Sequence, residues 1–319
     1  MNEIIVHSFA KINLSIDVLG TMPNGMHQVD MIMQQISFHD DVNVRFKPER
    51  ERRRGDIDII MKTNRPYLPV DDRNLGVKAA RLIVAQYGEK LPGGVLMIDI
   101  LKRIPVAAGL AGGSGNGAAV IHGLNTLWRL GMDLEKVCEL CGELGSDVPF
   151  SAMGQARCCY NLPKKIRKDS LAVSCARAGG SGTSLTPLKP LRKAIVIAKP
   201  PISVSTREVY GGIDDCVISR RPDNEALAAG LAGGNDKQIY DNFINVLEEY
   251  SLRAHPEIST LKEMMEKETA ARKVMMSGSG PTVFGVFDSM KIGSLITLAA
   301  KYASFSLYAA VSPVTRFLK

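Results

Sequence analysis

The glycine-rich segment 105–117 has the composition and the position of a phosphate-binding loop. Its sequence is Pro-Val-Ala-Ala-Gly-Leu-Ala-Gly-Gly-Ser-Gly-Asn-Gly. It follows an apolar run at 95–101 that predicts a strand, and it leads into an amphipathic helix predicted to begin near Ser114. Glycines leave backbone N–H groups accessible and allow positive φ angles, and a helix N-terminus attracts anions. The segment therefore predicts a phosphate site, since a simple turn would need fewer glycines.

The spacing of these glycines excludes two widespread nucleotide-binding motifs. No Gly-Lys-Ser/Thr follows them, as a Walker A loop requires. Gly109, Gly112 and Gly113 are also mis-spaced for the dinucleotide fingerprint, and no βαβ unit opens the chain. We therefore expect backbone N–H groups and the Ser114 hydroxyl to hold the phosphate in place of a loop lysine.

Two other segments combine polar residues with glycines. Gly145-Ser-Asp-Val-Pro149 follows a helix predicted over 134–144, and taken alone it favours a turn or cap function for Asp147. The segment 276–284, Met-Ser-Gly-Ser-Gly-Pro-Thr-Val-Phe, lies between two predicted strands and by itself fits a bulged hairpin. Neither segment alone identifies a reaction.

The hydrophobic pattern predicts the elements that must position these segments. A first strand over 4–19 directs Lys11 and Asn13 to the same face, because side chains two residues apart share a face. A helix is predicted over 75–87, with Asn74 as its N-cap. The other predicted strands are at 29–38, 42–46, 57–61, 194–198, 273–276, 282–287 and 306–311. Helices within 206–270 and at 291–302 then predict an antiparallel C-terminal sheet covered by helices.

The periodic pattern is lost between 157 and 190, where the chain is basic and rich in serine, glycine and proline. This stretch predicts an irregular connection between two domains, 1–156 and 191–319. Within it we expect 157–175 to be an inserted, mobile surface excursion outside any pocket.

Length and composition are those of an ordinary globular protein. The chain has 319 residues, 45% hydrophobic and 23% charged, which is enough for two domains. No apolar run approaches the ~20 residues that span a bilayer. The N-terminal Met-Asn-Glu-Ile-Ile-Val-His lacks the regions of a secretion signal. We therefore predict a cytoplasmic protein with no membrane partner.

The formal net charge of +7 is modest for this length. The basic runs at 50–54 and 164–168 lie in loop-like stretches without interleaved aromatic residues, which favours solvated loops over a nucleic-acid surface. A basic balance also suits an enzyme with polyanionic substrates. We predict no nucleic-acid partner.

The six cysteines favour reduced structural thiols. Cys138 and Cys141 have C-x-x-C spacing, but both fall on the apolar face of the helix predicted over 134–144. No second cysteine pair or nearby histidine pair completes a zinc site, so metal or redox function is the minor alternative.

Taken together, in this order and spacing, the three motifs resemble those of the GHMP kinase superfamily. The resemblance covers nearly the whole chain. It includes Ala-Lys-Ile-Asn-Leu at 10–14, Asn-Gly-Met-His at 24–27, Lys-Pro-Pro-Ile-Ser-Val-Ser-Thr at 199–206, 221–227 and 242–248. The first three of these segments point to the branch that phosphorylates a cytidylated alcohol.

The resemblance implies an α+β fold with two domains and an active site between them. The N-terminal domain would resemble domain 2 of ribosomal protein S5, and the C-terminal domain would be ferredoxin-like. The implied reaction transfers the γ-phosphoryl group of ATP, with Mg²⁺, to the 2-hydroxyl of a cytidylated methylerythritol in the non-mevalonate route to isoprenoids. Ser114 is one candidate metal ligand.

Site residues are carried over by position from the same resemblance. Lys11 and Asp147 are the implied catalytic pair, because a carboxylate accepts the hydroxyl proton and an ammonium offsets phosphoryl charge. The implied substrate-binding residues are Asn13, Met26, His27 and Tyr210. The implied ATP-binding residues are Pro105, Val106, Ala107, Ala108, Gly109, Leu110, Ala111, Gly112, Gly113, Ser114 and Gly115.

The chain departs from the superfamily pattern at three positions within these motifs. Met26 stands where an aromatic residue usually stacks on cytosine, and Gly115 stands where a second serine is expected. The Gly-x-Gly-Glu pattern appears as Gly-Ser-Gly-Thr at 180–183, without its glutamate. Two alternatives stay open: a mevalonate- or homoserine-type kinase, and a non-catalytic RNA-binding module, against which the intact Lys11 and Asp147 argue.

Overall fold

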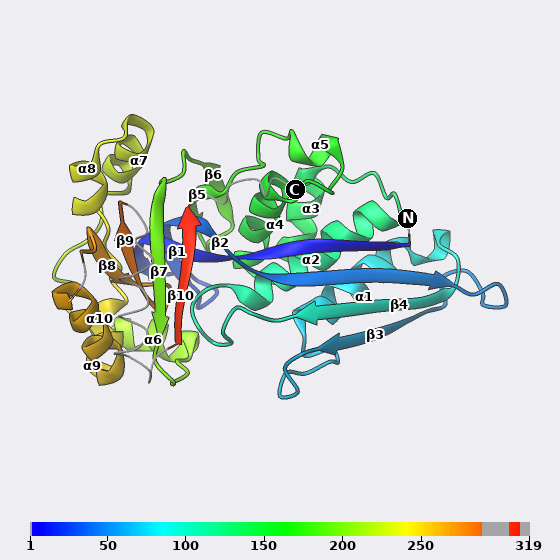
Figure 1. Ribbon diagram of the computed structural model, residues 1–319, viewed down its shortest axis with the longest axis horizontal. Coiled ribbons are helices and arrows are strands. Elements are labelled where there is room, and N and C mark those ends of the chain that lie inside the picture. The colour runs from blue at the N-terminus through cyan, green and yellow to red at the C-terminus, as the bar shows by residue number, and fades with distance from the viewer. Residues whose placement is uncertain (1, 269, 289–305, 313–319) are drawn as a thin grey trace.

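Two β-sheets and the helices packed on them form the structure (Figure 1), a computed structural model that describes residues 2–268, 270–288 and 306–312. The strands are β1 (Glu3–Thr21), β2 (His27–Pro48), β3 (Ile57–Thr63), β4 (Gly94–Leu101), β5 (Cys175–Gly180), β6 (Ser184–Pro187), β7 (Lys193–Lys199), β8 (Lys273–Met276), β9 (Val283–Phe287) and β10 (Ser306–Ser312). The helices are α1 (Leu75–Tyr87), α2 (Gly112–Leu127), α3 (Leu134–Gly142), α4 (Asp147–Cys158), α5 (Lys164–Arg167), α6 (Thr206–Ile213), α7 (Asn224–Gly233), α8 (Asp236–Asp241), α9 (Glu248–Ala254) and α10 (Pro256–Glu268).

The first sheet contains β1 to β6. Strands β1 and β2 form a long antiparallel pair, and β2 also pairs with β4 through 41–48 and with β5 through 29–34. The predicted strands 29–38 and 42–46 are thus one strand. The apolar pattern breaks at the polar residues His39, Asp40 and Asp41, but their backbone continues the ladder.

Helices α1 to α4 cover this sheet with an apolar core that also includes residues of β1, β2 and β4. The predicted helix 75–87 is confirmed, with the Asn74 side chain accepting from Gly76 N. Helix α4 was not predicted, because the Gly-Ser-Asp-x-Pro sequence is typical of a turn. Pro149 is compatible with the helix since it lies in the first turn, where its missing N–H is not needed.

The expectations of an irregular connection at 157–190 and of a surface excursion at 157–175 are wrong in large part. Strands β5 and β6 extend the first sheet beside β2. Leu162, Ile166 and Ala172 are buried in the same core as the helices. These three residues do not belong to one helix or strand, since α5 (Lys164–Arg167) contains Ile166 alone, and the sequence therefore shows no periodic pattern. The division into 1–156, 157–190 and 191–319 stays a prediction, while the two sheets separate between Pro187 and Lys193.

Removing an apolar side chain from this segment should therefore destabilise the protein. Ile166→Ala is expected to lower the free energy of unfolding by about 2–4 kcal/mol, since Ile166 is buried and a cavity would remain. The adjacent, exposed Lys165→Ala is the control and should change stability by less than about 0.5 kcal/mol. Urea denaturation of both variants measures the difference. Equal free energies of unfolding for the two variants would show that 157–175 is a surface excursion after all.

The second sheet contains β7 to β10 in the order β10-β7-β9-β8, all antiparallel. In chain order this is fourth-first-third-second, the strand order of a ferredoxin-like sheet. The predicted antiparallel C-terminal sheet is confirmed, whereas the predicted helix at 291–302 lies outside the described residues. A shared apolar core joins the sheets, with Ile12 and Ile32 from the first and Ile195 and Phe284 from the second.

Cys138 and Cys141 pack among apolar side chains of the first core, as predicted. Burial raises the pKa of the Cys138 thiol to about 12, so this thiol is protonated at neutral pH. No helix in the described part of the chain is both long enough and apolar enough to cross a bilayer.

Candidate active site

A cavity of about 970 Å³ lies where the first glycine loop, β1, α4 and α6 meet. Its lining includes every residue from 105 to 114, most of the segment 105–117 that we call the first glycine loop. It also includes Gly278 and Ser279 of the segment 276–284, which we call the second glycine loop. The six other predicted site residues also line it: Lys11, Asn13, Met26, His27, Asp147 and Tyr210. The fold thus brings together residues that are more than 190 positions apart in the sequence.

Gly115 is the predicted ATP-binding residue that does not line the cavity. It lies on the buried side of α2, where a Cβ atom would collide with the Ser8 hydroxyl of β1. The glycine found in place of the expected serine therefore fits a close contact between helix and strand.

Lys11 and Asp147, which both line the cavity, form an ion pair. The Lys11 Nζ lies 3.8 Å from Asp147 Oδ2 and donates to Asn13 Oδ1 at 2.6 Å. The Lys11 side chain is 6% exposed and that of Asp147 is 30% exposed, so the carboxylate is the more accessible partner. Irregularities in the β1–β2 register flank this point of β1, and such bulges re-aim side chains.

Asn13 is fully buried. Its amide oxygen accepts from Lys11, and its amide nitrogen lies 3.4 Å from the Met31 sulfur. Through these contacts Asn13 holds the Lys11 ammonium in place. The contact of Asn13 with substrate stays a prediction.

The lining of the cavity also contains an aromatic pair, His27 and Tyr210. Their ring centroids are 5.2 Å apart at an interplanar angle of 49°. The His27 Nε2 lies 2.9 Å and 3.1 Å from the two carboxylate oxygens of Asp214, a residue that the sequence motifs did not indicate. A proton on Nε2 satisfies this contact and leaves Nδ1 as an acceptor. Burial and the nearby charge of Asp147 raise the pKa of the Tyr210 hydroxyl.

The first glycine loop has a left-handed backbone at three residues. Ala107, Gly109 and Ala111 have φ angles of 50°, 69° and 54°, so Gly109 is the one glycine of this loop that uses the positive φ expected of its glycines, and the others lie in α2. A Cβ atom on Gly109 would collide with the carbonyl oxygens of Ser277 and Gly280, so the two glycine loops touch. Helix α2 begins at Gly112, two residues before the predicted start, and its first turn lines the cavity.

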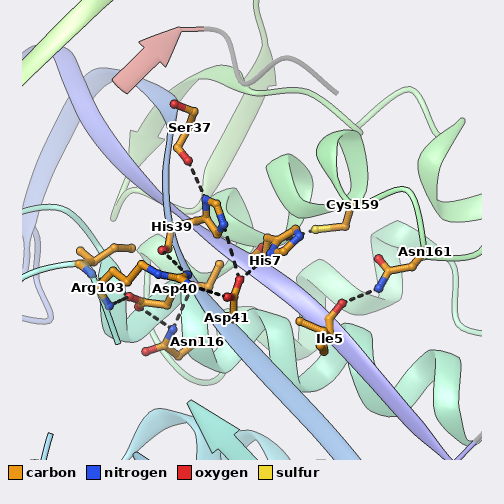
Figure 2. A network of polar contacts seen from close by, with 12 residues as sticks. Ile5, His7, Ser37, His39, Asp40, Asp41, Arg103, Asn116, Cys159 and Asn161 are labelled. Carbon is orange, nitrogen blue, oxygen red and sulfur yellow. Dashed lines mark hydrogen bonds and ion pairs between the residues drawn. The ribbon is translucent and has the colours of Figure 1, made fainter. Parts of the chain in front are cut away.

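A buried carboxylate that sequence analysis missed anchors this loop. Asp40 accepts from the backbone N–H groups of Arg103 and Ile104 at 2.7 Å and 2.8 Å, and from the Asn116 amide at 2.9 Å (Figure 2). It also pairs with the Lys102 ammonium, which lines the cavity. Burial lowers the pKa of Lys102 and the Asp40 charge opposes that shift. The only sequence signal was the polar break in the pattern of β2.

Arg207 is a second residue that the motifs did not indicate. It lies on α6, three residues before Tyr210, and lines the cavity. It has no ion-pair partner among the described residues. Its free positive charge fits a site for phosphorylated ligands.

Comparison with known proteins agrees with this geometry. Residues 74–155 match the GHMP kinases N terminal domain, and residues 220–297 match the GHMP kinases C terminal domain. The chain is 40% identical over 290 residues to the 4-diphosphocytidyl-2-C-methyl-D-erythritol kinase of Alkaliphilus metalliredigens, covering 91% of this chain and 89% of that protein. It is 41% identical over 280 residues to the same-named kinase of Geobacillus kaustophilus, covering 88% and 86%.

Solved structures show the same fold. A crystal structure of 4-(cytidine 5'-diphospho)-2C-methyl-D-erythritol kinase superposes with a TM-score of 0.72 at 27% identity, covering 97% of this chain and 98% of that one. Homoserine kinase from Cytophaga hutchinsonii gives a TM-score of 0.64 at 15% identity, over 97% and 95% of the two chains, which shows a shared fold alone.

The fold and the paired glycine loops are those of a GHMP kinase, as the sequence resemblance predicted. The chain belongs to the 4-diphosphocytidyl-2-C-methyl-D-erythritol kinase family, and it is an ATP-dependent kinase. The alternative of a non-catalytic RNA-binding module is therefore set aside.

Proposed function

We propose that this kinase transfers the γ-phosphoryl group of ATP to the 2-hydroxyl of 4-diphosphocytidyl-2-C-methyl-D-erythritol, giving the 2-phosphate and ADP in the non-mevalonate pathway. The observation that carries this proposal is the placement of the Lys11–Asp147 pair in one cavity with the phosphate loop and the His27–Tyr210 pair. The names of the relatives support the choice of substrate.

In the proposed mechanism Asp147 is the general base. Its carboxylate accepts the proton of the 2-hydroxyl as that oxygen bonds to the γ-phosphorus, and the bond to the bridging β–γ oxygen breaks to release ADP. The Lys11 ammonium, 3.8 Å from the carboxylate, stabilises negative charge on the transferring group. Asn13 is the positioning residue for Lys11, because its amide oxygen accepts from Nζ.

The first glycine loop would hold the ATP phosphates through backbone N–H groups within 106–114, which include the N-terminus of α2. The Ser114 hydroxyl lines the same part of the cavity and, with phosphate oxygens, provides the hard oxygen ligands that Mg²⁺ prefers. Ser114 is accordingly our candidate protein ligand. The ion, when bound, neutralises charge on the β- and γ-phosphates.

The cytosine base is proposed to stack on Tyr210 beside His27, with Met26 at the mouth of the cavity as a weaker, non-aromatic contact. Asp214 would hold the His27 ring through Nε2. The imidazole Nδ1 is then an acceptor for an amino group such as that of cytosine.

Tyr210→Ala should raise the substrate KM about tenfold with little change in the ATP KM, because base stacking is worth about 1–3 kcal/mol. Tyr210→Phe keeps the ring and is the control, with a substrate KM near that of the unmodified enzyme. Met26→Tyr should lower the substrate KM or leave it unchanged. Steady-state kinetics with each substrate varied measures these values, and an unaltered substrate KM in Tyr210→Ala would remove Tyr210 from the site.

A coupled assay of ADP release distinguishes this function from other alcohol kinases of the same fold. Turnover is expected with 4-diphosphocytidyl-2-C-methyl-D-erythritol and not with mevalonate or homoserine. Faster turnover with either of the latter would overturn the proposed substrate while leaving the enzyme a kinase.

The proposal includes a cytoplasmic location and a small-molecule substrate as partner, without nucleic acid or membrane. The six cysteines are free thiols, which is typical of a reducing compartment.

A further inference from the structure

Two imidazoles and a carboxylate meet on the first sheet at residues that do not line the cavity. They belong to His7 on β1 and to His39 and Asp41 on β2 (Figure 2). The His7 Nδ1 lies 2.7 Å from Asp41 Oδ1, and the His39 Nε2 lies 3.5 Å from the same oxygen. One ligand atom from each side chain lies within 4.8 Å of the others, and all three side chains are partly buried.

The pairing of two strands produces this arrangement. His7 is the direct partner of Asp41 in the β1–β2 ladder, and cross-strand partners project to the same face. His39 precedes Asp41 by two residues on the same strand and therefore shares that face. The ladder fixes the cluster without any bound ion.

Neighbouring groups hold each of the two β2 side chains in a defined orientation. The His39 Nδ1 lies 2.7 Å from the Ser37 carbonyl oxygen, so Nδ1 carries the proton and the lone pair of Nε2 faces Asp41. Arg103 donates to Asp41 Oδ2 at 2.7 Å, which leaves Oδ1 directed at the histidines. A backbone carbonyl behind an imidazole is the usual outer contact of a metal-binding histidine.

We propose that His7 Nδ1, His39 Nε2 and Asp41 Oδ1 bind one zinc ion, with water as the fourth ligand. Zinc takes imidazole nitrogen and carboxylate oxygen at about 2.0–2.2 Å, which places ligand atoms of a tetrahedral site about 3.3 Å apart. The two separations from Asp41 Oδ1, 2.7 Å and 3.5 Å, lie on either side of that value, and the two imidazole nitrogens lie within 4.8 Å of each other. When Nδ1 of His7 coordinates the ion, the ring stays neutral with its proton on Nε2, so binding exchanges the imidazole tautomer through solvent. The site differs from that of the kinase Mg²⁺, which prefers oxygen ligands throughout.

Zinc at this position would stabilise the residues that precede the first glycine loop. Arg103 bonds Asp41 through its side chain and Asp40 through its backbone N–H, and Asp40 is the anchor of that loop. The ion would therefore act as a structural clamp between β1 and β2, outside the chemistry of phosphoryl transfer.

The test is zinc titration of the full-length enzyme after removal of metals with a chelator. Isothermal titration calorimetry should show about one Zn²⁺ per chain, and Mg²⁺ in place of Zn²⁺ should show no binding at this site. His7→Gln and His39→Gln should each weaken zinc binding on the order of 100-fold, because each removes one of three protein ligands. Cys138→Ala is the control for the C-x-x-C pair and should bind zinc as the unmodified enzyme does.

Substitution of Co²⁺ gives a second readout, since its visible spectrum should show nitrogen and oxygen ligands without a thiolate charge-transfer band. Circular dichroism of the metal-free variants verifies that they are folded. If a histidine variant does not fold, Asp41→Asn takes its place, because asparagine keeps the shape of the side chain. The proposal is overturned if the unmodified enzyme binds no zinc, if folded His7→Gln and His39→Gln bind it equally well, or if Cys138→Ala removes the binding.

Discussion

Replacing Asp147 with asparagine is expected to lower kcat by about 10²–10⁴-fold, the usual contribution of general-base catalysis. Asparagine keeps the shape of the side chain at the first residue of α4 but cannot accept the hydroxyl proton. The nucleotide Kd should stay nearly unchanged, because in the proposed mechanism the first glycine loop would hold the phosphates without a contribution from this carboxylate. ADP release gives kcat, and calorimetric titration gives the nucleotide Kd.

Asp133→Asn provides a matched control for this experiment. Asp133 also lies at the start of a helix, as the N-cap of α3, and asparagine caps a helix equally well. Its kcat should be close to that of the unmodified enzyme. Near-normal turnover in Asp147→Asn would show that Asp147 is not the general base and that its role is limited to the start of α4.

Replacing Lys11 with methionine should lower kcat on the order of 10²-fold or more, because a preorganised positive charge at the transferring phosphoryl group is lost. Methionine fills the same buried space without the charge. The double variant with Asp147→Asn should fall far less than the product of the two single effects, since Lys11 and Asp147 act on one transition state.

The double-variant cycle separates a shared role from two independent ones. Measured kcat values for both single variants and the double variant complete the cycle. Independent, multiplicative losses would show that the 3.8 Å contact between Lys11 and Asp147 is structural and that the two residues do not work as a unit.

Elements with a strong local pattern were predictable from sequence, and those set by long-range pairing were not. Helix α1 is an example of the first kind, because its apolar period and its Asn74 cap lie within its own sequence. Strands β5 and β6 are of the second kind. Their sequences, Cys-Ala-Arg-Ala-Gly-Gly and Ser-Leu-Thr-Pro, lack the β-branched alternation of a strand, and pairing with β2 holds them in place.

The candidate site shows the same division. The first glycine loop could be recognised from residue types alone, but the proximity of Lys11 and Asp147 followed only from resemblance to a known family. The roles of Asp40 and Asp214 could not be predicted from nearby residues, because their partners come from segments more than 60 positions away. Gly115 was assigned to ATP because sequence position does not distinguish the exposed side of α2 from its buried side.

The contact between the two glycine loops links nucleotide binding to the integrity of the whole chain. Gly109 rests against the carbonyl oxygens of Ser277 and Gly280, and Ser277 Oγ donates back to the Gly109 carbonyl oxygen at 3.1 Å. The C-terminal half therefore supports the conformation of the first glycine loop, in addition to Asp40 of the N-terminal half. Since ligands stabilise the state that binds them, we expect ATP to stabilise both halves together, and unfolding of either half to weaken nucleotide binding.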